Sequence, residues 1–450
     1  MSFPRYPTYK PSGVEWLGEV PEHWSIIRLK NVLQCRITDG PHTTPEFIDE
    51  GVPFLSVDGI QDGELKFDGC RFISEKDHEE FSRKAQPVRD DILMGKAAST
   101  GKIARVKTDF TFSIWSPLAL IRVDSQLSSP SFYEQALKSA ISQAQIDVLC
   151  TSNTQKNISM DDIPRLVMTR PTIEEQLAIA TFLDHETAKI DALIAEQQRL
   201  IELLQEKRQA VISHAVTKGL NPHAPMKDSG VEWLGEVPEH WEILELKHLK
   251  KVGSSITYGI VQAGPHIDEG IPYIRTSDMA GDRLWLETCQ RTTAEIDQSY
   301  ARSKVEAGDL VIAIRATVGK TLEVPTELHG ANLTQGTAKF SPGAKVNAQF
   351  VKASFDADYC QSQIMSSAKG ATFLEITLDT LRHLKLAIPP PKEQGEIVQY
   401  LAGATSGIGE LLLAAEQTNG LLQERRSALI SAAVTGQIDV RGLVPEAEAA

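Results

Sequence analysis

Three consecutive residues of this chain resemble part of a phosphate-binding loop. Gly319, Lys320 and Thr321 match the end of the P-loop motif, in which backbone amides and a lysine hold nucleotide phosphates. The full motif also needs a glycine five positions before Gly319, and the chain has Ile314 there. We therefore do not expect a nucleoside triphosphatase site.

A second glycine cluster resembles a dinucleotide-binding turn. Gly403, Gly407 and Gly409 are spaced as in short-chain dehydrogenases, and Tyr300 with Lys304 matches the Tyr-x-x-x-Lys pair of those enzymes. Such a turn must follow a strand and open a βαβ unit, whereas the residues before Gly403 are predicted to be helical. Only 41 residues follow Gly409, and the Tyr–Lys pair lies upstream of the glycines instead of downstream. We expect these glycines to loosen a long helix.

The remaining catalytic signatures are missing from the sequence. It contains no Asn/Asp-Pro-Pro-Tyr/Phe run to hold a flipped adenine and no Phe-x-Gly-x-Gly turn for S-adenosylmethionine. Its eleven histidines form no His-Glu-x-x-His motif and no cluster of metal ligands. The sequence therefore favours a binding and scaffolding protein without catalytic residues or a metal site.

Composition and charge narrow the class of protein. The chain has 450 residues, 41% of them hydrophobic, which is enough for several domains with cores of their own. Five scattered cysteines, no secretory leader and no unbroken apolar run of about 20 residues favour a soluble cytoplasmic protein without a membrane partner. The net charge is −14, but residues 25–170 carry only −2 and residues 242–388 only −1. Any contact with DNA must therefore be local or shared with a more basic partner.

An internal duplication organises the chain. The sequence Ser-Gly-Val-Glu-Trp-Leu-Gly-Glu-Val-Pro-Glu-His-Trp occurs unchanged at residues 12–24 and 229–241, which we call the two boxes. A second matching pair, rich in Leu, Gln, Glu and Arg, occurs at residues 203–217 and 421–435. A period near 218 residues is far longer than the repeats of solenoid proteins, so we expect a duplicated domain pair. Diverged centres between shared ends indicate one scaffold that presents two different surfaces.

Two kinds of element alternate along the chain. Short β-branched and aromatic runs (52–57, 110–115, 118–123, 273–276, 310–314) and helical stretches (132–145, 350–369) predict an α+β globule in each half. Residues 171–217 follow a heptad, with seam positions Ile190, Ile194, Gln197, Ile201, Leu204, Arg208, Val211 and Ala215. The copy has Ile408, Leu412, Ala415, Asn419, Leu422, Arg426, Leu429 and Ala433. We expect the two helices to pair antiparallel; the alternative is that each packs only on its own globule.

This pattern divides the chain into seven segments. We expect a first box segment at 1–24, a recognition block at 25–170, a central helix at 171–218, a linker with the second box at 219–241, a second block at 242–388, a distal helix at 389–438 and a tail at 439–450.

These features together resemble the specificity subunit of type I restriction–modification systems. The resemblance is carried by the two boxes, by a Pro-x-x-x-Glu-Gln start to each long helix (171–176 and 389–394) and by the paired Leu-Leu-Gln-Glu-Lys/Arg-Arg helices. It frames almost the whole chain.

The resemblance implies a fold, partners and a mechanism. Two globular target recognition domains would be joined by two long antiparallel coiled-coil helices, in a pseudo-twofold internal duplication. Each domain would read one half of a bipartite site on double-stranded DNA. Two modification (methyltransferase) subunits would dock on this scaffold, and restriction (translocase and endonuclease) subunits would join them. S-adenosylmethionine, ATP and Mg²⁺ would serve those partners, and this chain would bind no cofactor.

Base reading needs polar side chains on loops that can enter the major groove. Three polar loops occur at matching places in the two halves: 38–44 with 257–262, 98–102 with 316–320, and 151–156 with 369–372. Lys102 and Lys320 suit phosphates, and Arg275 and Arg315 suit guanine edges. The predicted DNA-binding residues are Thr38, Asp39, His42, Thr43, Thr44, Ser99, Thr100, Lys102, Asn153, Thr154, Gln155, Lys156, Tyr258, Gln262, Arg275, Arg315, Thr317, Lys320, Lys369 and Thr372.

The four tryptophans of the boxes need a different role. Trp16, Trp24, Trp233 and Trp241 are the same in two halves that must read different sequences, which favours scaffold packing or partner docking over base stacking. Two alternatives remain for the whole chain: the recognition subunit of a related fused restriction–modification enzyme, and a non-catalytic assembly adaptor whose domains bind proteins.

Overall fold

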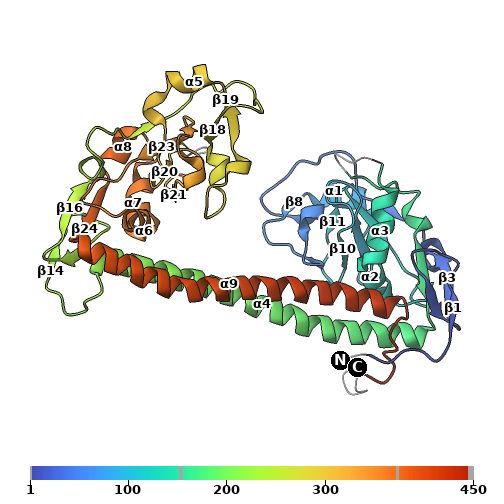
Figure 1. Ribbon diagram of the computed structural model, residues 1–450. Helices are drawn as coiled ribbons and strands as arrows, with labels where there is room; N and C mark the ends of the chain where they lie inside the picture. The colour runs from blue at the N-terminus through green and yellow to red at the C-terminus, as the bar shows by residue number, and fades with distance from the viewer. Residues whose placement is uncertain (1–2, 152–155, 371–373, 444–450) are drawn as a thin grey trace. The chain divides into compact units, whose positions relative to one another are not determined.

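The structure, a computed structural model, describes residues 3–151, 156–370 and 374–443. It divides into two compact units. Unit 1 comprises residues 1–197 and 417–450, and unit 2 comprises residues 198–416. Each unit contains one recognition block and part of both long helices (Figure 1).

Unit 1 contains a four-stranded antiparallel sheet and a three-stranded mixed sheet. The first has the order β10-β9-β12-β4 and the second β11-β5-β8. Two-stranded ribbons are formed by β1 with β2, β3 with β13, and β6 with β7. The strands are β1 Tyr9–Pro11, β2 Glu19–Pro21, β3 Ser25–Arg28, β4 Thr38–Asp39, β5 Val52–Leu55, β6 Ile60–Gln61, β7 Glu64–Leu65, β8 Arg71–Ile73, β9 Ile92–Gly95, β10 Ile103–Arg105, β11 Ser113–Ile114, β12 Leu118–Ile121 and β13 Val167–Arg170.

Unit 2 repeats this topology almost strand for strand. Its four-stranded sheet has the order β17-β23-β20-β21, its three-stranded sheet β19-β18-β22, and its ribbons pair β14 with β15 and β16 with β24. The strands are β14 Met226–Asp228, β15 Glu236–Pro238, β16 Glu242–Glu245, β17 Thr257–Tyr258, β18 Ile271–Ile274, β19 Gln290–Thr292, β20 Leu310–Ala313, β21 Thr321–Glu323, β22 Asn332–Leu333, β23 Thr337–Phe340 and β24 Lys385–Ile388. The internal duplication predicted from the boxes is therefore confirmed at the level of topology.

Short helices cover the sheets, and two long helices extend from the blocks. Unit 1 has α1 Glu75–Ser82, α2 Pro130–Lys138 and α3 Ala140–Leu149, and unit 2 has α5 Ala294–Ser299, α6 Ala348–Asp356, α7 Asp358–Ser367 and α8 Leu378–Arg382. The long helices are α4 Ile173–Lys218 and α9 Pro391–Val434, drawn green and red in Figure 1. The α+β class and the two long helices agree with the sequence analysis.

The stretches predicted to be helical at 132–145 and 350–369 do lie almost entirely in helices, but each is divided between two helices. Residues 132–145 do not form one helix, because Ser139 ends α2 and caps α3, its Oγ accepting from the amide of Ser142 at 3.3 Å. Residues 350–367 are divided between α6 and α7 at Ala357, where no side chain caps the second helix. The glycines of α9 do not interrupt it, since the helix runs unbroken through Gly403, Gly407 and Gly409. A continuous helix there also excludes the dinucleotide turn.

The predicted heptad seam is buried between the long helices. In unit 1, Ile190 and Leu429 belong to one hydrophobic cluster, and Arg426 donates to Asp191 through Nε at 2.7 Å and Nη2 at 3.1 Å. In unit 2, residues near the end of α4 share a cluster with Ile397 and Leu401 near the start of α9. The start of one helix thus packs on the end of the other in each unit, which is antiparallel pairing. Among the described seam positions, Arg208 is the one that is exposed.

The boxes hold the helix ends. In each unit a strand inside the box (β2 or β15) pairs antiparallel with the strand just before the box (β1 or β14) and leads to a fully buried tryptophan. Trp24 donates from Nε1 to Glu175 of α4 at 3.4 Å, and Trp241 donates to Glu393 of α9 at 3.1 Å. Those acceptors are the glutamates of the two Pro-x-x-x-Glu-Gln starts. Two motifs about 150 residues apart in the sequence therefore meet in both units.

The opposite helix end lies against the same tryptophan. Gly219 follows α4 with φ +73°, and a Cβ there would lie 3.2 Å from Trp241. Gly436 follows α9 with φ +74°, and a Cβ there would lie 3.0 Å from Trp24. Only glycine combines this left-handed backbone with such a close approach. Each buried box tryptophan thus joins the start of one long helix to the end of the other.

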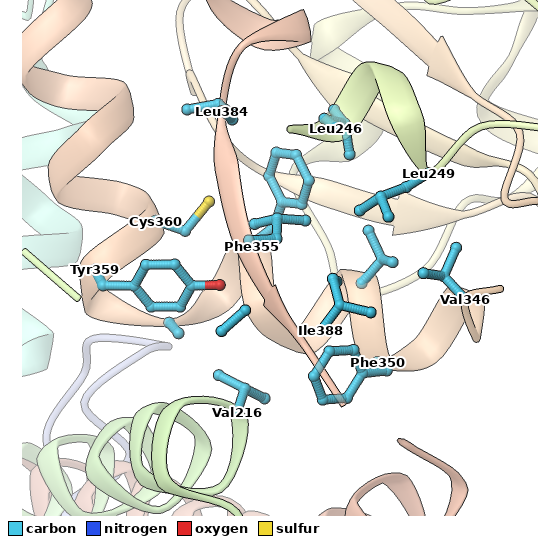
Figure 2. Packing of buried hydrophobic residues seen from close by; sticks show 14 of the residues in the cluster. Val216, Leu246, Leu249, Val346, Phe350, Phe355, Tyr359, Cys360, Leu384 and Ile388 are labelled. Atoms are coloured by element: carbon cyan, nitrogen blue, oxygen red, sulfur yellow. The ribbon is translucent and has the colours of Figure 1, made fainter. Parts of the chain in front are cut away.

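The core of unit 2 shows how its block packs on the long helices. Val216 of α4 belongs to one hydrophobic cluster with Phe350 and Phe355 of α6 and with Leu384 and Ile388 around β24 (Figure 2). Unit 1 has the corresponding cluster around Trp24. The recognition blocks are therefore fixed to the helices by hydrophobic cores.

One described helix has the length and composition of a membrane span. An 18-residue window of α9 reaches a mean hydropathy of 1.3. The same criterion is met by a helix whose apolar seam packs on another helix, as that of α9 does on α4.

All five cysteines are free thiols.

Candidate nucleic-acid interface

The described parts of the three predicted loops of unit 1 lie at the same end of the strands of its four-stranded sheet. Loop 38–44 begins in β4, loop 98–102 joins β9 to β10, and loop 151–156 follows α3. The carbonyl of Lys96 accepts from the amide of Ile158 at 2.9 Å, and the hydroxyl of Thr100 donates to the carbonyl of Lys156 at 2.7 Å. The second and third loops are therefore hydrogen-bonded to each other.

A buried carboxylate connects the first loop to the second. Asp39 is 6% exposed and accepts from Lys96 at 2.8 Å and from the ammonium group of Lys84, while His42 lies 3.1 Å away. Burial alone would raise the pKa of Asp39, but the hydrogen bonds from Lys84 and Lys96 outweigh it, so this pKa lies below its usual value. An ionised Asp39 thus holds two lysines and a histidine beside loop 38–44. This makes it a positioning residue, and its own contact with DNA stays a prediction.

The other predicted residues of unit 1 are largely accessible. His42, Thr43, Thr44, Lys102 and Lys156 are exposed, and Thr38, Ser99 and Thr100 are partly exposed. Lys156 is engaged with Asp147 at 2.6 Å. Asn153, Thr154 and Gln155 lie outside the described residues.

Unit 2 brings its two predicted arginines together. Arg275 and Arg315 line one groove with Ile260 and Val261 of the first loop. The guanidinium of Arg275 donates to both carboxylate oxygens of Asp278, at 2.7 and 3.0 Å, so its fork is already occupied within the protein.

Arg315 is better placed to meet a ligand than Arg275. One of its terminal nitrogens donates to Glu375 at 2.9 Å, while its buried Nε has no protein partner among the described residues. Of the remaining predicted residues, Tyr258, Gln262, Thr317 and Lys369 are exposed. Lys320 is half-buried with Asp282 at 3.6 Å, and Thr372 lies outside the described residues.

The second loop has the same backbone in both units. Ala98 and Ala316 take left-handed φ values of 64° and 61°, and Gly101 and Gly319 both have φ 88°. The amide of Gly101 donates to Gly95 at 2.8 Å, and that of Gly319 donates to Ala313 at 2.9 Å. Gly319 therefore lies in a hairpin between antiparallel strands, which excludes the P-loop, because that loop must open a helix.

The side chains on this shared backbone differ. Asp39 of β4 matches Tyr258 of β17, and Lys96 after β9 matches Ile314 after β20. One unit therefore has a charged cluster where the other has an exposed aromatic residue and a buried aliphatic residue. The two units thus share a loop backbone and differ in the side chains around it.

Sequence reasoning missed the residues that position the predicted ones. Lys84 and Lys96 bind Asp39, and Asp278 and Glu375 bind the two arginines of unit 2. A comparison of the two halves of the sequence could have revealed Lys96, because it is a charged residue at the position where the second half has Ile314. Lys84 lies 45 residues from Asp39, and no periodic pattern in the sequence connects the two.

The described residues hold no metal-binding group. Among them, no three His, Cys, Asp or Glu side chains come together in a way that could ligate a metal ion. What the three loops offer in each unit is hydrogen-bond donors and acceptors with local positive charge, which is the chemistry of base edges and phosphates.

Comparisons with known proteins agree with this architecture. Residues 238–408 match the family described as the type I restriction modification DNA specificity domain. The chain is 27% identical over 346 residues to the EcoBI type I restriction enzyme specificity subunit of Escherichia coli, covering 73% of this chain and 72% of that protein. It is 22% identical over 433 residues to the MjaVIII specificity subunit of Methanocaldococcus jannaschii, covering 94% and 95%.

The fold has been seen before. A solved structure concerned with complex assembly and conformational transition of the type I R-M system matches with a TM-score of 0.70 at 17% identity, covering 93% of this chain and 99% of that one. The duplicated boxes, the paired helix starts, the fold and these relatives agree. The chain is thus similar over most of its length to the specificity subunits of type I restriction–modification systems, and it shares the fold of a solved protein of such a system.

Proposed function

We propose that this chain gives a type I restriction–modification complex its DNA sequence specificity, each unit reading one half of a bipartite site. One observation carries the proposal: both units keep the same loop backbone, down to a left-handed alanine, and vary the side chains on it. A scaffold for a single ligand would have no need of two diverged copies.

The long helices connect the two readers. Each helix contributes residues to both units, and each is unbroken over more than 40 residues. A continuous helix transmits a fixed rise of about 1.5 Å per residue. We assign the helices to setting the length of the non-specific gap between the half-sites.

The exposed part of each box is assigned to partner docking. Trp16 and Trp233 occupy the same position in the two identical boxes, and they are 46% and 45% exposed. Packing explains the identity of the buried residues but not that of exposed ones, and the two DNA halves differ. If each box docks one copy of the same partner, the modification subunit, the exposed residues of the two boxes must be identical as well. Trp16 borders a mainly apolar groove on α3, with Ile141 and Val148, that suits an apolar segment of that partner.

Catalysis belongs to the partners under this proposal. The chain selects the site and delivers the active centre of the modification subunit to an adenine that the subunit flips out of the duplex. S-adenosylmethionine, ATP and Mg²⁺ would be used by the modification and restriction subunits, in the cytoplasm.

The test combines co-purification with mapping of methylated adenines. Co-expression with the modification subunit should give a complex that binds DNA and methylates a split consensus. Trp16→Ala and Trp233→Ala, combined, should abolish co-purification, whereas Trp285→Ala, an exposed tryptophan outside the boxes, should not. A partner bound equally well without any DNA preference would instead support the assembly adaptor.

A further inference from the structure

A basic groove lies beside the first reading loop of unit 1. Its lining includes Arg28, Lys30, Arg36 and Arg165, all exposed, against one acidic residue, Asp161. In a chain with a net charge of −14, four cations around one groove are a local reversal of sign.

Most of this charge is not neutralised within the protein. Among the described residues, Arg28, Lys30 and Arg36 form no ion pair, while Arg165 pairs with Asp162 at 2.9 Å. Arg122 of unit 1, by contrast, donates through two nitrogens to Asp91, at 2.7 Å each. The groove therefore keeps cations available for an anion from outside.

The walls of the groove are held by regular backbone. Arg28 ends β3 and pairs in register with Val167 of β13. The next residue, Leu29, donates from its amide to the carbonyl of Leu166 at 2.8 Å, joining the short helices at 29–32 and 163–165. The cations thus project from a fixed frame, which lowers the cost of arranging them around a ligand.

The groove continues into the reading loop. Thr38 lines it and begins β4, and the next residue is Asp39 with its two lysines. In a duplex, a row of phosphates runs along each side of the groove in which the base edges are exposed. If loop 38–44 reads base edges, the cations beside it therefore lie where the DNA backbone passes.

Unit 2 differs at the matching place. Its frame is the same, since Leu246 donates to Leu384 at 2.9 Å. Glu245, however, takes the place of Arg28 and pairs with Lys247 at 2.6 Å and His248 at 3.5 Å. At these two matching positions the charges of Glu245 and Lys247 therefore offset each other, whereas Arg28 and Lys30 of unit 1 are both cationic and, among the described residues, form no ion pair.

We propose that this groove binds the phosphodiester backbone of the duplex next to the half-site read by unit 1. The inference rests on the proposed DNA-reading function and adds to it an asymmetry: unit 1 supplies more of the salt-sensitive affinity than unit 2. The groove contributes affinity and orientation but no sequence preference, because phosphates are the same at every base pair.

The test measures affinity against salt concentration. The full chain, in complex with its modification subunit, is titrated with a duplex carrying the mapped site and with an unrelated duplex. For the triple variant R28A/K30A/R36A, each lost phosphate contact should make the slope of log K against log salt shallower by about 0.9. The methylated consensus should stay the same. Lys247→Ala, the matched lysine already paired with Glu245, should change the slope less than Lys30→Ala.

The outcomes separate the inference from the function on which it rests. If the wild-type complex binds its site but the triple variant has the same slope, the groove does not contact phosphates and the inference fails. If the variant no longer co-purifies with the modification subunit in the absence of DNA, the groove binds an acidic protein surface, which also overturns it. If the wild-type complex shows no preference for a bipartite site, the proposed function itself fails. Circular dichroism of the variant checks that it is folded.

Discussion

Replacing Asp39 by Asn tests whether the charged cluster organises the reading loops of unit 1. The side chains of Asp39 and Lys96 are 8% and 13% exposed, so their hydrogen bond is shielded from water, whereas half-exposed Lys84 can turn into solvent. Asn keeps one acceptor oxygen but not the charge. The expected loss of unfolding free energy in unit 1 is therefore about 1.5–3 kcal/mol, the range for hydrogen bonds to charged groups.

Hydrogen exchange and methylome mapping together measure this effect. In D39N, amides of β9, β10 and loop 98–102 should exchange faster, while those of unit 2 should not change. Methylation should tolerate more bases in one half-site and keep the other. Asp109→Asn is the control, because Asp109 is 75% exposed and pairs with an exposed arginine, a kind of pair worth less than about 1 kcal/mol.

Unchanged exchange together with an unchanged consensus in D39N would refute the assignment of Asp39 as a positioning residue. Faster exchange throughout unit 1 with both half-sites kept would show a purely structural role.

Three further predictions address the units, the helices and the box. Exchanging residues 25–165 for a homologous block should change one half-site in the methylome, and a change in both would contradict modular reading. Inserting four residues near Ala195 should lengthen the non-specific gap by one or two base pairs, since about 6 Å of helix corresponds to about 3.4 Å per base pair; an unchanged gap would count against the helices as spacers. For Glu175, burial raises the pKa, but hydrogen bonds from His23, Thr172 and Trp24 outweigh burial, so the pKa in the folded protein lies below its usual value of about 4.5. The ionised form therefore contributes stability above about pH 4.5, and this stability is lost as the pH falls through the pKa of the folded state. The difference in melting temperature between wild type and E175Q should therefore shrink below about pH 4.5, and a constant difference from pH 7 to 3 would oppose this reading.

The sequence alone determined the features that follow from local spacing. Apolar residues every three or four positions define one face of a helix wherever the chain lies, so the seam from Ile190 to Ala215 could be recognised without coordinates. Identity between the boxes required the two halves to share a scaffold. Both predictions are confirmed, because each depends on residues close together in sequence or on simple repetition.

The tertiary structure decided what depends on contacts across long separations. It brought Trp24 onto Glu175, about 150 residues away, and Lys84 and Lys96 onto Asp39. It also divided the helical stretch expected at 132–145 into α2 and α3, because the side chain of Ser139 caps the start of α3. A buried charge is stable only where its partners converge in space, and the chain's path through the fold, not the spacing of residues along it, determines which partners those are.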